Sequence, residues 1–156
     1  MTTFKTKAQD FLAQERIAVV GVSRTQKDAA NLIYRSLRSE GYKVFAVNPN
    51  AELVEGDTCY PNLKALPSKV DGVIIVTRAD QTGQIVRECA EVGVSRVWMH
   101  ENGFLGAASS SVSEEAVVYC QNNGITVIAG GCPLMFSEFG HKCMRWILGA
   151  LKRLPD

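Results

Sequence analysis

Short apolar runs recur along the chain, and neighbouring runs are separated by segments in which apolar and polar residues mix at helical spacing. An apolar run of about four to eight residues is typical of a strand that is buried on both faces of a sheet. Strands that alternate with helices form a mainly parallel sheet, because parallel neighbours need a crossover between them. The runs lie at residues 17–20, 42–47, 72–76, 96–99 and 125–129. We therefore predict an α/β fold, with a doubly wound, mainly parallel five-stranded sheet and helices on both faces.

Three of the intervening segments carry a signal for the end of a helix. Each closes on a glycine, and glycine is favoured just after a helix because it adopts the left-handed backbone conformation without steric cost. The segments are residues 29–41, 80–93 and 113–124, and they close on Gly41, Gly93 and Gly124. We expect these segments to be the crossover helices.

The rest of the chain divides between two outer helices and two connections. Helical spacing predicts a helix over residues 4–14 and a last one over residues 137–151. Residues 49–70 contain glycine and prolines, and are predicted to be an irregular connection with one short helical turn. Residues 101–111 are rich in glycine and serine, and suit a loop over the edge of the sheet.

Charge and cysteine content narrow the class of protein. The 156 residues suit one domain, residues 1–156, and a net charge of +1 supplies no field for steering nucleic acid. The sequence shows neither a leader nor the run of about eighteen apolar residues that a membrane span needs. Its five cysteines include no Cys-x-x-Cys pair and its two histidines stand far apart, which argues against a metal site. We predict a cytoplasmic protein that binds neither nucleic acid nor membrane.

The first apolar run leads into Gly21, as a buried strand does at a nucleotide-binding turn. A dinucleotide fingerprint would place further glycines two and five positions later, where this chain has Ser23 and Gln26. Arg24 and Lys27 instead bring positive charge to the start of a helix, which itself favours anions. The turn therefore predicts a local site for phosphate.

Polar residues also follow the other predicted strands, at the sheet edge where a doubly wound fold binds its ligand. Asn48 and Pro49 follow the second strand, where a nicotinamide-binding protein usually has an acid for the ribose. A neutral amide there suits a ligand with a phosphorylated ribose, because a carboxylate would repel it. The same residues are also typical of a simple turn.

Five motifs in order carry a resemblance to a known family. They are GVSR at 21–24, VNPN at 47–50, VDGVIIVT at 70–77, VSRVWM at 94–99 and GGCPLMF at 130–136. Together they resemble the small stand-alone coenzyme A (CoA)-binding proteins, and are similar to the CoA-binding domain of the succinyl-CoA synthetase alpha subunit. The resemblance spans residues 17–136 and implies a Rossmann-like domain that binds CoA.

The resemblance and the strand ends together define a candidate site for CoA. The residues of this predicted site are Gly21, Val22, Ser23, Arg24, Lys27, Val47, Asn48, Pro49, Val76, Thr77, Arg78, Met99, His100 and Cys132. No catalytic residue is assigned, because no acid and base are paired in the sequence. Cys132 is open to two interpretations: it either packs in the core or meets the thiol of CoA and forms a mixed disulfide with it.

The synthetase subunit carries a further domain with a phosphorylated histidine, and the sequence after Phe136 is too short to supply one. We therefore predict a non-catalytic protein that binds CoA or acyl-CoA as a carrier, sensor or regulatory subunit.

Two alternatives remain open. One is an NADP-dependent oxidoreductase in which Arg24 and Lys27 hold the ribose phosphate. The other is an interaction module with a vestigial nucleotide site. The last predicted helix has an apolar stripe typical of a core or of a contact with a second copy or a partner subunit. Its residues are Phe139, Cys143, Trp146, Ile147 and Ala150.

Overall fold

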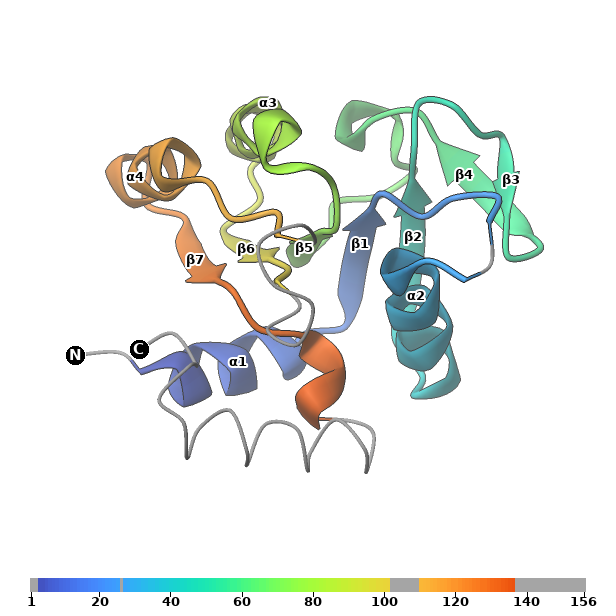
Figure 1. Ribbon diagram of the computed structural model, residues 1–156, viewed down its shortest axis with the longest axis horizontal. Coiled ribbons are helices and arrows are strands. Elements are labelled where there is room, and N and C mark those ends of the chain that lie inside the picture. Colours follow the sequence, from blue (N-terminus) through green and yellow to red (C-terminus); the bar gives the residue numbers. More distant parts are fainter. Residues whose placement is uncertain (1–2, 26, 102–109, 137–156) are drawn as a thin grey trace.

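The computed structural model describes residues 3–25, 27–101 and 110–136 (Figure 1). The helices are α1 (Phe4–Leu12), α2 (Ala29–Ser39), α3 (Ala79–Glu91) and α4 (Glu114–Asn122), with short 3-10 helices η1 (Leu63–Ala65) and η3 (Pro133–Phe136). The strands are β1 (Arg16–Val20), β2 (Lys43–Val47), β3 (Leu53–Val54), β4 (Asp57–Tyr60), β5 (Gly72–Ile75), β6 (Arg96–Met99) and β7 (Thr126–Ala129). The predicted class is confirmed: the fold is α/β and Rossmann-like.

The sheet has seven strands, two more than the sequence predicted. Their order is β3-β4-β2-β1-β5-β6-β7, and every neighbouring pair is parallel except β3 and β4. The five predicted strands lie side by side within this order. The extra two form a hairpin inside residues 49–70, which were expected to be irregular apart from the helical turn now seen as η1. Their two and four residues are too short to show a pattern in the sequence.

With β4 beside β2, six strands adopt the order of a doubly wound nucleotide-binding fold. The chain reverses its direction of growth between β1 and β5, the two central strands of that order. A crevice forms at such a switch point, beyond the carboxyl ends of the strands, because the connections leave in opposite directions. Strand order alone therefore predicts that the candidate site lies between the carboxyl ends of β1 and β5.

Helices cover both faces of the sheet, with α1 and α2 on one side and α3 and α4 on the other (Figure 1). Alternate residues of each strand divide between the two faces, as the pleat of a strand requires. In β1, Val19 packs in the core cluster on the α1 and α2 side, and Val20 packs in the cluster on the α3 and α4 side. We call these the first and the second core cluster.

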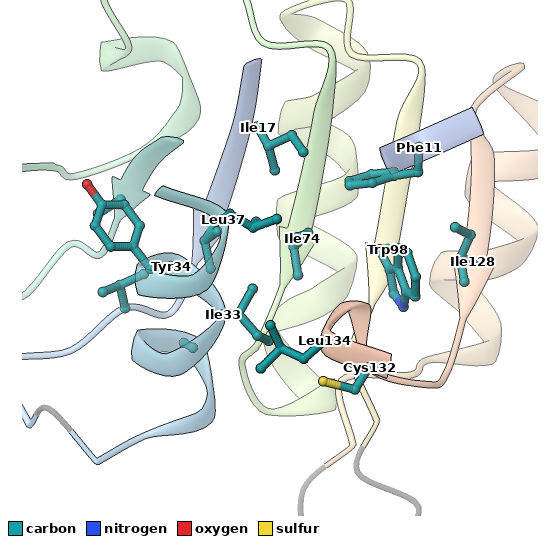
Figure 2. Packing of buried hydrophobic residues seen from close by; sticks show 14 of the residues in the cluster. Phe11, Ile17, Ile33, Tyr34, Leu37, Ile74, Trp98, Ile128, Cys132 and Leu134 are labelled. Carbon is teal, nitrogen blue, oxygen red and sulfur yellow. The ribbon is translucent and has the colours of Figure 1, made fainter. Parts of the chain in front are cut away.

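Trp98 of β6 packs in the first core cluster, near Phe11 and Ile128 (Figure 2). The rings of Phe4 and Phe11 from α1 meet its indole edge-on, with centroids 5.9 and 5.5 Å away. The indole Nε1 donates to the Gly130 carbonyl at 3.1 Å, so the polar atom of this buried side chain is satisfied. Trp98 therefore fixes α1 and the turn after β7 against the sheet.

The predicted helix ends are confirmed, since the chain adopts positive φ at each expected glycine. Gly41, Gly93 and Gly124 follow α2, α3 and α4 with φ of 94°, 77° and 68°. The helix predicted over 4–14 is α1. The helix predicted over 137–151, with its apolar stripe, and most of the loop 101–111 lie outside the described residues. Within the described part of the chain, no helix is long and apolar enough to cross a membrane.

Candidate functional site

A cavity of about 950 Å³ opens at the switch point, within the usual size range of cofactor pockets. Its walls come from the ends of β1, β2, β5 and β6, the first turns of α3, and residues 61–63 and 110–111. Eight of the predicted site residues line it: Gly21, Val47, Asn48, Pro49, Val76, Thr77, Arg78 and His100. The structure therefore brings together the residues that follow four of the predicted strands.

Gly21 forms the floor of the cavity where three strands end. Its φ is +108°, and a Cβ atom at this position would lie 2.2 Å from the carbonyl oxygen of Val76. Its amide donates to the Val47 carbonyl at 2.9 Å, which joins β1 to β2. Only glycine fits here, because a side chain would force β1 and β5 apart.

Asn48 ties the β2 end to the β1–α2 turn, the loop at residues 21–28. Its Nδ2 donates to the Val22 carbonyl at 2.9 Å, and its Oδ1 accepts from the Asn50 amide at 2.9 Å. The turn role that the sequence allowed is therefore present. The same residue also lines the cavity, so holding the turn and bordering the ligand space are compatible.

Ser111 anchors the opposite wall and was not predicted from the sequence. Its Oγ accepts from the Thr77 amide at 3.0 Å and donates to the Thr77 carbonyl at 2.6 Å. Its own carbonyl accepts from the Thr82 hydroxyl at 2.6 Å. Ser111 is only 1% exposed, so these bonds hold the end of β5 and the start of α3 in a buried setting. The serine-rich stretch gave a weak signal for a loop but none for this contact.

The start of α3 faces the cavity with no side chain bonded to its first amides. Arg78 is the N-cap residue and makes no side-chain cap, and Gln81 and Gln84 line the cavity one and two turns on. Uncapped amides at a helix start favour an anion, because they carry partial positive charge. Arg78 is itself exposed and pairs with Asp80 at 2.9 Å, so part of its charge is offset.

Ser23, Arg24 and Lys27 belong to the β1–α2 turn but do not line the cavity. Arg24 and Lys27 are exposed. Ser23 instead holds the turn: its hydroxyl donates to Asp28, and its amide donates to Asn31 Oδ1 at 3.0 Å. The predicted basic pair therefore stands on the surface beside the cavity walls rather than within them.

Three further predicted residues are buried and lie outside the lining. Val22 and Met99 are fully buried, and Cys132 is 7% exposed. Figure 2 shows Cys132 among the residues of the first core cluster, near Leu134. The positive φ of Gly130 and Gly131 turns the chain toward α1, where a Cβ atom at Gly131 would lie 2.9 Å from the Phe4 ring. The structure thus places Cys132 in its packing role.

Ten lining residues could not be read from strand ends alone. They are Ala29, Pro61, Asn62, Leu63, Gln81, Gln84, Ile85, Glu88, Ser110 and Ser111. Four of them lie on one face of α3, and which face a helix presents to a cavity depends on how it crosses the sheet. Among the described residues, no cluster of histidine, cysteine, aspartate and glutamate could hold a metal ion.

The fold is a Rossmann-like α/β domain with a crevice at its switch point, and comparison with known proteins gives its family. Residues 15–148 match the CoA binding domain family, and the chain belongs to that family. The predicted resemblance is therefore confirmed.

The relatives include large ligases and one small protein. The chain is 31% identical over 125 residues to the ADP-forming acetate–CoA ligase II subunit alpha of Pyrococcus furiosus. That match covers 78% of this chain and 27% of the subunit. It is 30% identical over 118 residues to the ADP-forming acetate–CoA ligase I of Archaeoglobus fulgidus, covering 74% of this chain and 17% of the ligase. It is 27% identical over 118 residues to the uncharacterized protein YneT of Bacillus subtilis, covering 76% and 82%. The chain thus spans less than a third of each ligase protein.

Solved structures show the same two kinds of neighbour. A hypothetical protein from Pyrococcus horikoshii OT3 has a TM-score of 0.75 and 26% identity, and the match covers 85% of this chain and 87% of that one. An acetyl-coenzyme A synthetase from Candidatus Korarchaeum cryptofilum, in complex with phosphate and ADP, has a TM-score of 0.63 and 31% identity. That match covers 74% of this chain and 25% of the synthetase chain.

Proposed function

We propose that this protein binds CoA or acyl-CoA at the cavity between β1 and β5, and that it works as a carrier, sensor or regulatory subunit rather than as an enzyme. One observation carries the proposal: the cavity of a CoA binding domain lies at the switch point, over a floor that only Gly21 can form. A glycine floor lets a bulky phosphate approach the backbone closely.

The surroundings of the cavity suit the phosphates of CoA. The uncapped start of α3 offers amides, and Arg78 adds a guanidinium that can pair with phosphate in place of Asp80. Arg24 and Lys27 add positive charge from the exposed turn. Asn48 leaves the β2 end without a carboxylate, so nothing there repels a phosphorylated ribose.

Both carboxylates that line the cavity accept from groups of the protein in the free state. Glu88 accepts from the Leu63 amide at 3.1 Å, and Asp80 pairs with Arg78. A general base needs a carboxylate or imidazole within reach of substrate and of a partner that tunes it. We therefore assign neither Asp80 nor Glu88 as a general base, and we propose binding without catalysis. The matches cover only 17% of the Archaeoglobus fulgidus ligase and 27% of the Pyrococcus furiosus subunit, so they carry no argument for ligation.

Cellular location is part of the same proposal. Cys59, Cys89 and Cys120 are free thiols, and CoA is itself a thiol that stays reduced only in a reducing compartment. We propose the cytoplasm as the place of action, with CoA or acyl-CoA as the small-molecule partner and a second copy or partner subunit as a further contact.

Ligand selectivity tests the proposal. Isothermal calorimetry and thermal unfolding are measured with CoA, acetyl-CoA, NAD and NADP. Saturable binding of CoA is expected, with a rise in unfolding free energy of about 2.7 kcal/mol at a hundredfold excess over Kd. NAD and NADP are expected to bind far more weakly. Binding of NADP without binding of CoA would replace this proposal with the oxidoreductase alternative, and binding of neither would favour the vestigial site.

A further inference from the structure

The β3–β4 hairpin contains an unusual backbone conformation. Leu53 pairs with Thr58 and Val54 with Asp57, which leaves Glu55 and Gly56 as a two-residue turn. Both have positive φ, 52° and 78°. Such turns favour asparagine, aspartate or glycine at the first position, because a longer side chain is strained in the left-handed region. Among the described residues, Glu55 is the one non-glycine with positive φ.

The side chain of Glu55 is held by contacts with α2. It is only 6% exposed, although it lies at the tip of a hairpin. Its Oε1 accepts from Arg35 at 2.9 Å and from Asn31 Nδ2 at 2.8 Å, and both partners lie on α2. Strained residues persist where surrounding contacts hold them, and such residues cluster at functional sites.

Asn31 continues the connection from the hairpin to the β1–α2 turn. It is fully buried, and its Nδ2 donates to the Ser23 carbonyl at 2.7 Å as well as to Glu55. Its Oδ1 accepts from the Ser23 amide at 3.0 Å. Glu55 therefore takes one of the two amide hydrogens of Asn31, and Ser23 takes the other. Glu55 and Ser23 together fix the orientation of the Asn31 side-chain amide.

We propose that Glu55 is a positioning residue for the ligand site: through Asn31, it holds the β1–α2 turn, which borders the cavity at Gly21 and Ala29, in the conformation that shapes the ligand space. Glu55 does not line the cavity, so its effect on ligand passes through Asn31 and Ser23. The proposal rests on the proposed function for its ligand, but the connection itself is a property of the free protein.

Asp57 provides a matched control on the same hairpin. Its Oδ2 accepts from Arg38 and from the Tyr34 hydroxyl, both at 2.7 Å and both on α2. These contacts also clamp the hairpin to α2. Neither partner contacts the β1–α2 turn, although Arg38 also donates to the Glu55 carbonyl at 2.9 Å. We therefore expect loss of the Asp57 carboxylate to loosen the hairpin and to leave the bonds between Asn31 and Ser23 in place.

The test compares Glu55→Gly, Glu55→Gln and Asp57→Asn by calorimetry with CoA. Glu55→Gly removes the carboxylate and relieves the strained backbone, so the variant is expected to fold and to bind CoA about tenfold more weakly. Glu55→Gln keeps an acceptor for Asn31 and is expected to recover most of that affinity. Asp57→Asn is expected to bind as the wild type does. Wild-type affinity in Glu55→Gly, or equal losses in Glu55→Gly and Asp57→Asn, would overturn the proposal.

A second readout needs no ligand and separates this proposal from the proposed function. Hydrogen exchange of the Ser23 amide, measured by NMR, is expected to be about tenfold faster in Glu55→Gly than in Asp57→Asn, because only the former releases Asn31. If the wild type binds no CoA, the proposed function fails, and this exchange rate alone decides the role of Glu55. Equal Ser23 exchange in both variants would show that Glu55 does not position the turn.

Discussion

The two walls of the cavity are built in different ways. The first wall comprises the β1–α2 turn and the β2 end, where Asn48 and Asn31 bond their side-chain amides to the backbone of Val22 and Ser23. The second wall comprises the β5 end and the start of α3, where Ser111 holds Thr77 and the first amides of α3 have no cap. The first wall is shaped by side chains that bond to the protein itself, and the second leaves donors for a ligand. The first wall therefore sets the shape of the cavity, and the second wall supplies the donors and positive charge for a ligand.

The largest expected effect comes from the floor between the two walls. Gly21→Ala places a Cβ 2.2 Å from the Val76 carbonyl oxygen at a φ of +108°, so the walls must separate. We expect a loss of more than about 2 kcal/mol in unfolding free energy and no measurable CoA binding. Urea unfolding and calorimetry measure both.

Gly124→Ala is the matched control for that prediction. Gly124 also has positive φ, +68°, but a Cβ there meets nothing within 4 Å. The expected loss is about 1 kcal/mol, from backbone strain alone, with CoA affinity unchanged. Equal effects of the two substitutions would show that close approach of β1 and β5 does not shape the site.

The anchor of the second wall gives a smaller effect. Ser111→Ala removes the partner of the Thr77 amide and carbonyl, and an unsatisfied buried group costs about 1–3 kcal/mol. We expect CoA affinity to fall severalfold as the β5 end loosens. Ser113→Ala, which removes the N-cap of α4, is expected to cost about 1 kcal/mol and to leave affinity unchanged. Loss of affinity in Ser113→Ala as well would indicate a global effect rather than a local anchor.

Charge on the two walls gives the third comparison. Arg78 lines the cavity, whereas Arg24 and Lys27 are exposed beside it. Arg78→Ala is expected to weaken CoA binding more than Arg24→Ala or Lys27→Ala does, and all three should change stability by less than about 0.5 kcal/mol. The losses should shrink as salt is raised. A larger loss in Arg24→Ala than in Arg78→Ala would move the main phosphate contact to the first wall.

The smallest expected effect concerns the cysteines. In native protein incubated with the disulfide of CoA, we expect no adduct at Cys132 or at the other three described cysteines, because only an accessible thiolate attacks a disulfide. Cys132 is packed in the first core cluster, and burial raises the pKa of Cys120 to about 11 and that of Cys89 further. Peptide mass spectrometry checks this before and after unfolding. An adduct at Cys132 in the native protein would restore the redox interpretation.

The sequence predicted those parts of the fold that depend on contiguous residues. Five strands and three glycine-terminated helices follow from local pattern, because buried strands are apolar throughout and helix ends need a left-handed residue. The β3–β4 hairpin was missed because Glu55 occupies a turn position where asparagine or glycine would have given the signal. Its conformation depends on Asn31 and Arg35, which are distant in sequence.

The candidate site divides in the same way. Gly21, Asn48, Thr77 and Arg78 were predicted because parallel strands bring their carboxyl ends to one edge. Ser111 was missed because its contacts are long-range. For Cys132 the sequence left both a packing role and a place at the crevice open, because the direction of the chain after Gly130 and Gly131 depends on their positive φ.

The most direct test of the central claim is to map CoA onto the protein by NMR. Backbone amide shifts of isotope-labelled protein are followed during titration with CoA. Saturable shifts are expected at Gly21, Asn48, Thr77 and the first turn of α3, the amides that surround the cavity. The amides of Ala8 and Phe11 in α1, on the first core cluster, should stay unchanged. Shifts absent from the cavity, or concentrated on another surface, would contradict the assignment of this crevice as the CoA site.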